Sequence, residues 1–174
     1  QLRDLGPATE AVKAIASLSR TLLAEGFALR TIDIGGGLGV DYDGAGAPTP
    51  AELAALVLPQ IKDLGLKLLL EPGRSLIAAA GALLTRVIAT KTNGARRFVI
   101  TDAAMNDLLR PSLYSAYHHI ENLSRGEETP LIQADIVGPV CESGDFFAKD
   151  RAIREPHEGD LLVILDAGAY SFSM

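Results

Sequence analysis

Cysteine is almost absent from this chain of 174 residues, which contains only Cys141. A single cysteine excludes an intramolecular disulfide framework and a cysteine-rich zinc site. Basic residues are scarce relative to acidic ones, with 16 Lys+Arg against 22 Asp+Glu and a formal net charge of −6. Because no basic surplus exists to neutralise phosphates, the composition argues against a nucleic-acid partner. No apolar run reaches the roughly 18 residues of a membrane span, so we expect no membrane partner.

The residues that are present favour a folded core. Hydrophobic residues make up 48% of the chain and charged residues 22%, a balance typical of globular proteins and not of disordered ones. We therefore expect a soluble, cytoplasmic protein of one domain, or of one domain and part of a second. The chain opens at Gln1, close to an amphipathic helix, and stops soon after an apolar strand. Domains usually finish on a polar, exposed tail, so we expect an excerpt of a longer protein.

The first part of the chain alternates between helices and strands. The pattern predicts a helix over residues 8–25, a strand over 29–34, a helix that begins with a capping box at Thr49, and a strand over 66–70. Pro59 inside the second helix is expected to kink it. This order is typical of a parallel sheet buried on both faces.

After about residue 80 the pattern changes to short strands separated by turns and polar stretches. The predicted strands cover residues 83–90, 97–101, 132–137 and 161–165. Their spacing favours an antiparallel or mixed sheet. The sequence thus predicts an α/β domain over residues 1–80, followed by a β domain over 81–174.

Two motifs lie at the carboxyl ends of the two predicted parallel strands, where ligands bind in such folds. They are Asp33-Ile34-Gly35-Gly36-Gly37-Leu38-Gly39 and Glu71-Pro72-Gly73-Arg74. Consecutive glycines let backbone N–H groups surround a phosphate, although a turn that needs positive φ angles is the alternative. The spacing fits neither a dinucleotide fingerprint nor a Walker loop. A carboxylate and a guanidinium there could hold a ring-nitrogen proton and clamp an anion, or they could form only a surface ion pair.

Three further clusters could carry chemistry. They are Arg110-Pro111-Ser112-Leu113-Tyr114-Ser115-Ala116-Tyr117-His118, Gly138-Pro139-Val140-Cys141-Glu142-Ser143-Gly144-Asp145, and Asp166-Ala167-Gly168-Ala169-Tyr170. Carboxylates beside Cys141 favour the neutral thiol, which can donate a proton; a buried apolar cysteine is the alternative. The three histidines, at 118, 119 and 157, have no metal-ligand spacing, so we interpret them as structural or surface residues and expect no metal site.

Taken in order, these five segments resemble the pyridoxal-phosphate-dependent decarboxylases of the alanine-racemase-like fold that act on ornithine, diaminopimelate and arginine. The resemblance runs from about residue 30 to the last residue, and the Cys141–Asp145 and Arg110–Tyr114 segments are closest to the diaminopimelate branch. It implies the C-terminal part of a β/α (TIM-like) barrel that binds pyridoxal phosphate, followed by a mostly antiparallel β domain. It also implies a homodimer that shares its active site across the interface.

The resemblance also implies residue roles in the decarboxylation of meso-2,6-diaminopimelate to L-lysine. It assigns the cofactor to Gly35, Gly36, Gly37, Gly39, Glu71, Pro72, Gly73, Arg74 and Tyr170. It assigns the substrate to Arg74, Arg110, Tyr114, Glu142 and Tyr170. Glu71 would pair with the pyridine nitrogen of the cofactor, and Cys141 would be the catalytic proton donor.

One expected residue of that family has no counterpart here, the lysine that forms a Schiff base with the cofactor. None of the five lysines ends a predicted barrel strand, and a complete barrel takes about 250 residues. We therefore expect this chain to be a fragment that is inactive in isolation. Two alternatives stay open: decarboxylation of another basic amino acid such as ornithine or arginine, and a non-catalytic relative that binds a partner chain.

Overall fold

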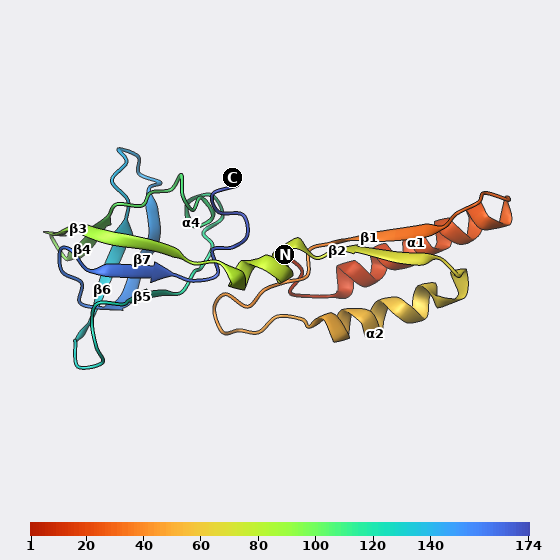
Figure 1. Ribbon diagram of the computed structural model, residues 1–174, viewed down its shortest axis with the longest axis horizontal. Helices are drawn as coiled ribbons and strands as arrows, with labels where there is room; N and C mark the ends of the chain where they lie inside the picture. Colours follow the sequence, from red (N-terminus) through yellow and green to blue (C-terminus); the bar gives the residue numbers. More distant parts are fainter. The chain divides into compact units, whose positions relative to one another are not determined.

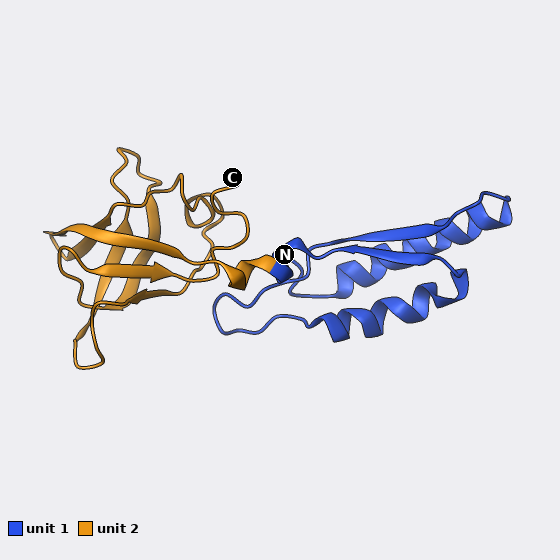
Figure 2. Ribbon diagram, viewed as in Figure 1, with its two compact units in different colours: residues 1–76 blue, residues 77–174 orange.

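The computed structural model describes all residues from 1 to 174, and the chain divides into two compact units. Unit 1 comprises residues 1–76 and unit 2 comprises residues 77–174, shown in blue and orange in Figure 2. Each unit has its own hydrophobic core.

Unit 1 contains two parallel strands and two long helices (Figure 1). Its elements are α1 (Gly6–Ala24), β1 (Thr31–Gly36), α2 (Pro50–Ile61), a 3₁₀ turn (Lys62–Leu64), β2 (Lys67–Glu71) and the start of the short helix α3 (Gly73–Ile77). The strands pair from Thr31 with Lys67 to Asp33 with Leu69, and after a register shift Gly36 pairs with Glu71. Parallel pairing brings the carboxyl ends of β1 and β2 to the same edge of the sheet.

The capping box predicted at Thr49 is confirmed. The Glu52 carboxylate accepts a hydrogen bond from the Thr49 backbone N–H at 2.7 Å, and the Thr49 hydroxyl accepts one from the Glu52 N–H at 3.2 Å. These reciprocal bonds satisfy donors that a helix start otherwise leaves unpaired. Helix α2 runs through Pro59 and ends two residues later, at Ile61.

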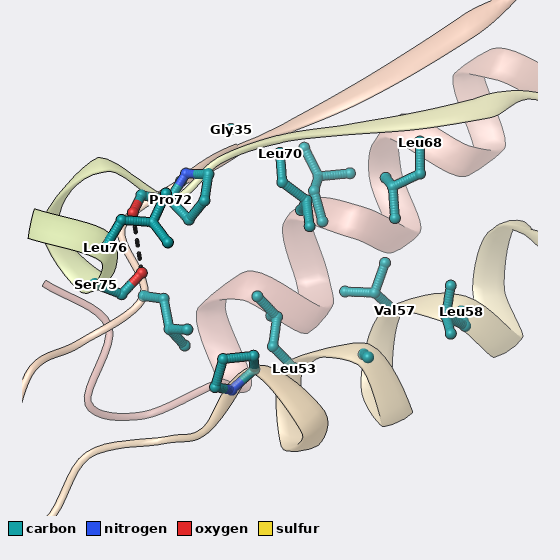
Figure 3. Close-up of a pocket in the computed structure, with 14 residues that line it drawn as sticks. Gly35, Leu53, Val57, Leu58, Leu68, Leu70, Pro72, Ser75 and Leu76 are labelled. Carbon is teal, nitrogen blue, oxygen red and sulfur yellow. Dashed lines mark hydrogen bonds between the residues drawn. The ribbon is translucent and has the colours of Figure 1, made fainter.

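The prediction that the parallel strands are buried on both faces is wrong for this chain. Val12 and Ala16 of α1 and Val57 of α2 pack against Ile32 of β1, so both helices cover the same face of the sheet. On the opposite face Leu69 is 38% exposed. The helix-covered side also has an apolar groove, into which leucines of α2 and β2 point (Figure 3).

Unit 2 is built on a six-stranded mixed sheet in the order β5-β8-β3-β4-β6-β7. The strands are β3 (Leu83–Asn93), β4 (Arg96–Thr101), β5 (Ile120–Asn122), β6 (Leu131–Val137), β7 (Phe146–Arg154) and β8 (Leu161–Ile164), and the short helix α4 covers Arg110–Tyr114. Only β4 and β6 pair in parallel; the other four neighbouring pairs are antiparallel. The core gathers side chains such as Val87, Leu108 and Phe147.

Two strands and one helix of unit 2 are absent from the sequence-based prediction. β5 has only three residues, too few for an alternating pattern to stand out. β7 carries Lys149-Asp150-Arg151 in its middle, with Asp150 at φ 47°, and the strand register shifts near this point. A charged, irregular segment of this kind hides the period of two on which strand prediction depends.

Asp160, just before β8, is a buried carboxylate that fastens the β5 end of the sheet. It is 6% exposed and accepts a bidentate pair of hydrogen bonds from Arg125 at 2.7 and 2.8 Å. The Asn122 side chain and the His157 backbone N–H also donate to it. Burial alone would raise the pKa of Asp160, but these hydrogen bonds outweigh burial and lower it to about 2.

We expect Asp160→Asn to lower the free energy of unfolding by about 2 kcal/mol at neutral pH, because the folded protein favours the ionised carboxylate. The folded-state pKa lies below the unfolded value, so this stability is present above about pH 4 and is lost as the pH falls towards 2. Urea unfolding of the full-length protein between pH 7 and pH 3 should show the difference between variant and wild type narrowing. Glu155→Gln, which removes the exposed ion pair with Arg97, is the matched control and should cost much less. Equal losses for the two variants would contradict the assignment.

Candidate active site

The glycine loop of unit 1 lies beside Glu71 because β1 and β2 come into close contact at their carboxyl ends. Gly36 pairs with Glu71, and a Cβ atom at Gly36 would collide with the Glu71 carbonyl oxygen. Gly35 and Gly37 have φ angles of 71° and 90°, which side chains other than glycine rarely adopt. At Gly39 a Cβ atom would lie 2.6 Å from the Leu2 carbonyl oxygen, which accepts the Gly39 N–H at 3.1 Å. Each of the four positions therefore has a steric or conformational reason to be glycine.

Arg74 lies in the first turn after β2, with Tyr42 as a neighbour that the sequence did not single out. Its guanidinium donates a hydrogen bond to the Tyr42 hydroxyl at 3.3 Å, and Tyr42 is only 5% exposed. Glu71 ends β2 and is exposed, and Pro72 accepts hydrogen bonds from Ser75 and Leu76 that start α3. Unit 1 thus brings the glycine loop, a carboxylate and a tyrosine-held guanidinium to one end of its sheet.

In unit 2, Arg110 is the first residue of α4 and is buried, with 6% exposure. Its Nη1 lies 2.7 Å from Nε2 of His118, which is fully buried. Tyr114, at the other end of this short helix, is 64% exposed. Arg110 and Tyr114 therefore differ in setting: the guanidinium is held within the fold, and the phenol is open to solvent or to a partner molecule.

The loop that contains Cys141 and Glu142 is held by Asp145. The Asp145 side chain is 4% exposed and accepts hydrogen bonds from the backbone N–H groups of Met105 and Val140, both at 2.7 Å. Its own N–H donates to the Glu142 carbonyl at 3.0 Å. Cys141 and Glu142 are both exposed. The buried aspartate thus fixes a loop in which the Cys141 and Glu142 side chains stay accessible.

Tyr170 lies in a tight turn after β8. It has a φ of 55° and is 48% exposed, and Asp166 of the same turn has a φ of 56°. At Gly168 a Cβ atom would collide with the Ile77 carbonyl oxygen, so the turn packs closely on its neighbour. The backbone conformation therefore leaves the Tyr170 side chain on the surface of unit 2.

The predicted site residues of unit 1 lie together at one end of its sheet, whereas those of unit 2 lie on three separate segments: α4, the Cys141–Asp145 loop and the turn after β8. His118 hydrogen-bonds to Arg110, and Asp145 to the backbone N–H of Val140 beside Cys141; both belong to clusters found in the sequence, which does not indicate these bonds. His119 and His157 are exposed, which agrees with their interpretation as surface residues. No group of three or more His, Cys, Asp and Glu side chains is placed to hold a metal ion. No helix is long and apolar enough to cross a membrane.

Comparison with known proteins assigns the chain to a family. Residues 16–168 match the C-terminal sheet domain of the pyridoxal-dependent decarboxylases. The whole chain is 52% identical to 42% of the length of a diaminopimelate decarboxylase from Neisseria meningitidis, and 46% identical to 41% of the one from Aquifex aeolicus. It superposes with a TM-score of 0.94 on 43% of the solved Helicobacter pylori diaminopimelate decarboxylase complexed with L-lysine, at 44% identity.

The chain therefore spans about two fifths of the length of the relatives that it matches, and it does not contain a complete barrel, since unit 1 has only two parallel strands. The match covers most of both units, including the glycine loop, the Glu71–Arg74 motif and the Cys141–Asp145 loop. This chain belongs to the pyridoxal-dependent decarboxylases.

Proposed function

We propose that the full-length protein containing this chain removes one carboxylate of meso-2,6-diaminopimelate as carbon dioxide and forms L-lysine, with pyridoxal phosphate as cofactor. The observation that carries the proposal is the similarity of the entire chain to diaminopimelate decarboxylases, 46% and 52% identical. The superposition on the Helicobacter pylori enzyme complexed with L-lysine supports it. The segments that we expect to bind the ligands lie within the matched region.

A decarboxylase of another basic amino acid is the second candidate. A lysine/ornithine decarboxylase from Vibrio vulnificus superposes with a TM-score of 0.86, but at 24% identity this likeness extends to the fold alone. The chain also offers groups for a substrate that is charged at both ends: Glu142 for an ammonium group and Arg110 for a carboxylate. Diaminopimelate has this pair of charges at each end, and ornithine lacks the distal carboxylate.

The donor groups of unit 1 fit pyridoxal phosphate. The Arg74 guanidinium and the backbone N–H groups of Gly36 and Gly37 suit its phosphate, with Pro72 and Gly73 in the same turn as Arg74, and the Glu71 carboxylate suits its protonated ring nitrogen. The Gly35 N–H already donates to the Asp33 carboxylate at 2.8 Å, so Gly35 contributes its positive φ to the loop. Gly39 uses its N–H for Leu2, so we assign it the close backbone packing of this loop. When bound, the cofactor supplies an electron sink for the bond that breaks. Glu71 keeps the ring-nitrogen proton in place, and Tyr170 of unit 2 would contact phosphate and substrate.

The remaining roles belong to unit 2. Arg110 and Tyr114 bind a carboxylate of the substrate or the cofactor phosphate, and Glu142 binds the distal ammonium group. As carbon dioxide leaves, the Cys141 thiol gives its proton to the carbon that has lost the carboxylate, and the resulting thiolate regains a proton from solvent. Because Cys141 and Glu142 are exposed in this chain, they are accessible to a second subunit. This supports a homodimer in which the two residues reach the partner's site.

The same proposal places residues 1–80 at the end of a β/α barrel and residues 81–174 in a β domain. Two parallel strands with helices on one face, and ligand-binding motifs at the carboxyl ends, support the barrel assignment. Lysine formation is a biosynthetic step, for which we propose a cytoplasmic location.

The direct test is to incubate the purified full-length protein and pyridoxal phosphate with meso-diaminopimelate, ornithine and arginine in parallel, and to measure carbon dioxide and the amine products. We expect L-lysine from diaminopimelate at a kcat/KM at least about tenfold above that of the other substrates. Preference for ornithine or arginine would establish the second candidate. Release of carbon dioxide from none of them would favour a non-catalytic relative that binds a partner chain.

We expect Cys141→Ala to lower kcat by about 10²–10⁴-fold, because it removes the proposed proton donor. The side chain is exposed, so the unfolding temperature should not change. Ser143→Ala alters an exposed neighbour in the same loop and is the matched control. Equal kcat values for Cys141→Ala and Ser143→Ala would rule out the role of the thiol.

Asp145→Asn should also lower kcat, by about tenfold, because an amide cannot accept both backbone N–H groups that the carboxylate accepts. The loop would lose its fixed position while Cys141 itself remains. The rate at which iodoacetamide alkylates Cys141 reports the mobility of the loop, and we expect it to rise in the variant. An unchanged or lower rate would argue against a loosened loop.

Reduction of the full-length holoenzyme with borohydride should attach the cofactor to a lysine outside residues 1–174. Lys67, for example, begins β2, at the opposite end of the strand from Glu71. Peptide mapping by mass spectrometry identifies the labelled lysine. Stoichiometric labelling of any of the five lysines of this chain would contradict the prediction.

A further inference from the structure

The hydrogen bonds of the His118 ring determine its protonation state. The Leu165 carbonyl oxygen lies 2.8 Å from Nδ1, and Nη1 of Arg110 lies 2.7 Å from Nε2. A carbonyl can only accept a hydrogen bond and a guanidinium can only donate one. Nδ1 must therefore carry the hydrogen and Nε2 must be an acceptor, so the ring is neutral. Its orientation is fixed from both sides.

Three elements hold His118 in this position. After α4 the chain turns back at Ser115, which has a φ of 51°, and both Ser115 and Ala116 donate their N–H groups to the Arg110 carbonyl. Arg151 of β7 donates to the His118 carbonyl at 2.7 Å. Leu165 directly follows β8. The ring is thus bonded to α4 and to the residue after β8, and its backbone carbonyl is bonded to β7, so His118 has little freedom, in agreement with its zero exposure.

The charged groups that face the ring are Arg110 from α4, Arg151 from β7 and Asp166 from the turn after β8. Burial lowers the pKa of His118, the Leu165 hydrogen bond opposes this, and the two arginines lower it while Asp166 raises it. The net effect lowers the pKa of His118. The neutral ring is therefore the form present at neutral pH, and acid is needed to convert it.

We propose that His118 is a positioning residue that acts through Arg110: its Nε2 orients the guanidinium that binds the anionic group of the substrate or cofactor. The inference rests on the proposed function, which gives Arg110 that role. A neutral imidazole suits the task because it accepts a hydrogen bond without contributing a negative charge to compete with the bound anion. Protonation of His118 would remove the acceptor and place a second cation against Arg110.

Two substitutions of His118 distinguish the role of Nε2 from the role of Nδ1. In His118→Gln the side-chain oxygen can occupy the place of Nε2 and accept from Arg110, whereas in His118→Asn the amide can replace only the Nδ1 donor to Leu165. His119→Asn is the control, since this neighbour is exposed and pairs with Glu121. The variants are made in the full-length holoenzyme, with KM for meso-diaminopimelate, kcat and the dissociation constant of pyridoxal phosphate measured from pH 5 to pH 9.

We expect His118→Asn to raise either KM or the cofactor dissociation constant by about tenfold or more, the loss typical of a hydrogen bond to a charged group. His118→Gln should remain within about threefold of the wild type. The constant that rises in His118→Asn identifies the anion that Arg110 binds. In the wild type the same constant should rise as the pH falls through the His118 pKa, and in His118→Gln this acid-side rise should disappear, because an amide does not titrate. Unfolding temperatures of all variants complete the comparison.

The inference would be overturned if His118→Asn and His118→Gln had the same binding constants. This holds if both variants bind like the wild type, and also if both bind more weakly and lose the same amount of unfolding temperature. An acid-side rise that persists in His118→Gln would overturn it as well. Arg110→Gln distinguishes this failure from failure of the proposed function. If Arg110→Gln leaves both binding constants unchanged, Arg110 has no anion to bind and the proposed role of that residue fails. If it raises one while the two His118 variants behave alike, only the positioning role fails.

Discussion

Buried polar side chains must find hydrogen-bonding partners, and in unit 2 this requirement fixes the segments that carry the predicted site residues. Asp145 satisfies its carboxylate with two backbone N–H groups and so holds the Cys141 loop. His118 satisfies both ring nitrogens and so holds Arg110. Asp160 satisfies its carboxylate largely with Arg125. Loss of one partner would leave the other buried and unpaired, which costs more than the bond contributes. The loops are thus fixed although they lie outside the regular strands.

In unit 1, close packing of the backbone fixes the segments that carry the predicted site residues. The close contact of Gly36 with the Glu71 carbonyl excludes any side chain at that position, and it sets the glycine loop next to the carboxylate. The position of the glycine loop in unit 1 depends on the absence of Cβ atoms, whereas the positions of the site segments in unit 2 depend on hydrogen bonds. Both arrangements leave donors and acceptors in place before a ligand arrives, which limits the entropy lost on binding.

Much of this could be predicted from the sequence because local chemistry determines it. The capping box at Thr49 requires only residues three positions apart, and the parallel pairing follows from the order of helices and strands. The strand β7 was missed because charges interrupt its alternation. The exposed face of β2 differs from the expectation because both helices of unit 1 pack on the other face of the strands. The partners of His118 and Asp145 lie as many as 47 and 40 residues away, so no local pattern could reveal them.

The proposed role of these residues in one decarboxylase is tested most directly by a crystal structure of the full-length protein with pyridoxal phosphate and L-lysine. The account predicts Glu71 against the pyridine nitrogen, and Arg110 in contact with an anionic group of the ligand or cofactor while it still donates to His118. It also predicts the Cys141 sulfur of one subunit near the carbon that loses carbon dioxide. A structure with the cofactor and L-lysine bound away from Glu71 and Arg110 would contradict it.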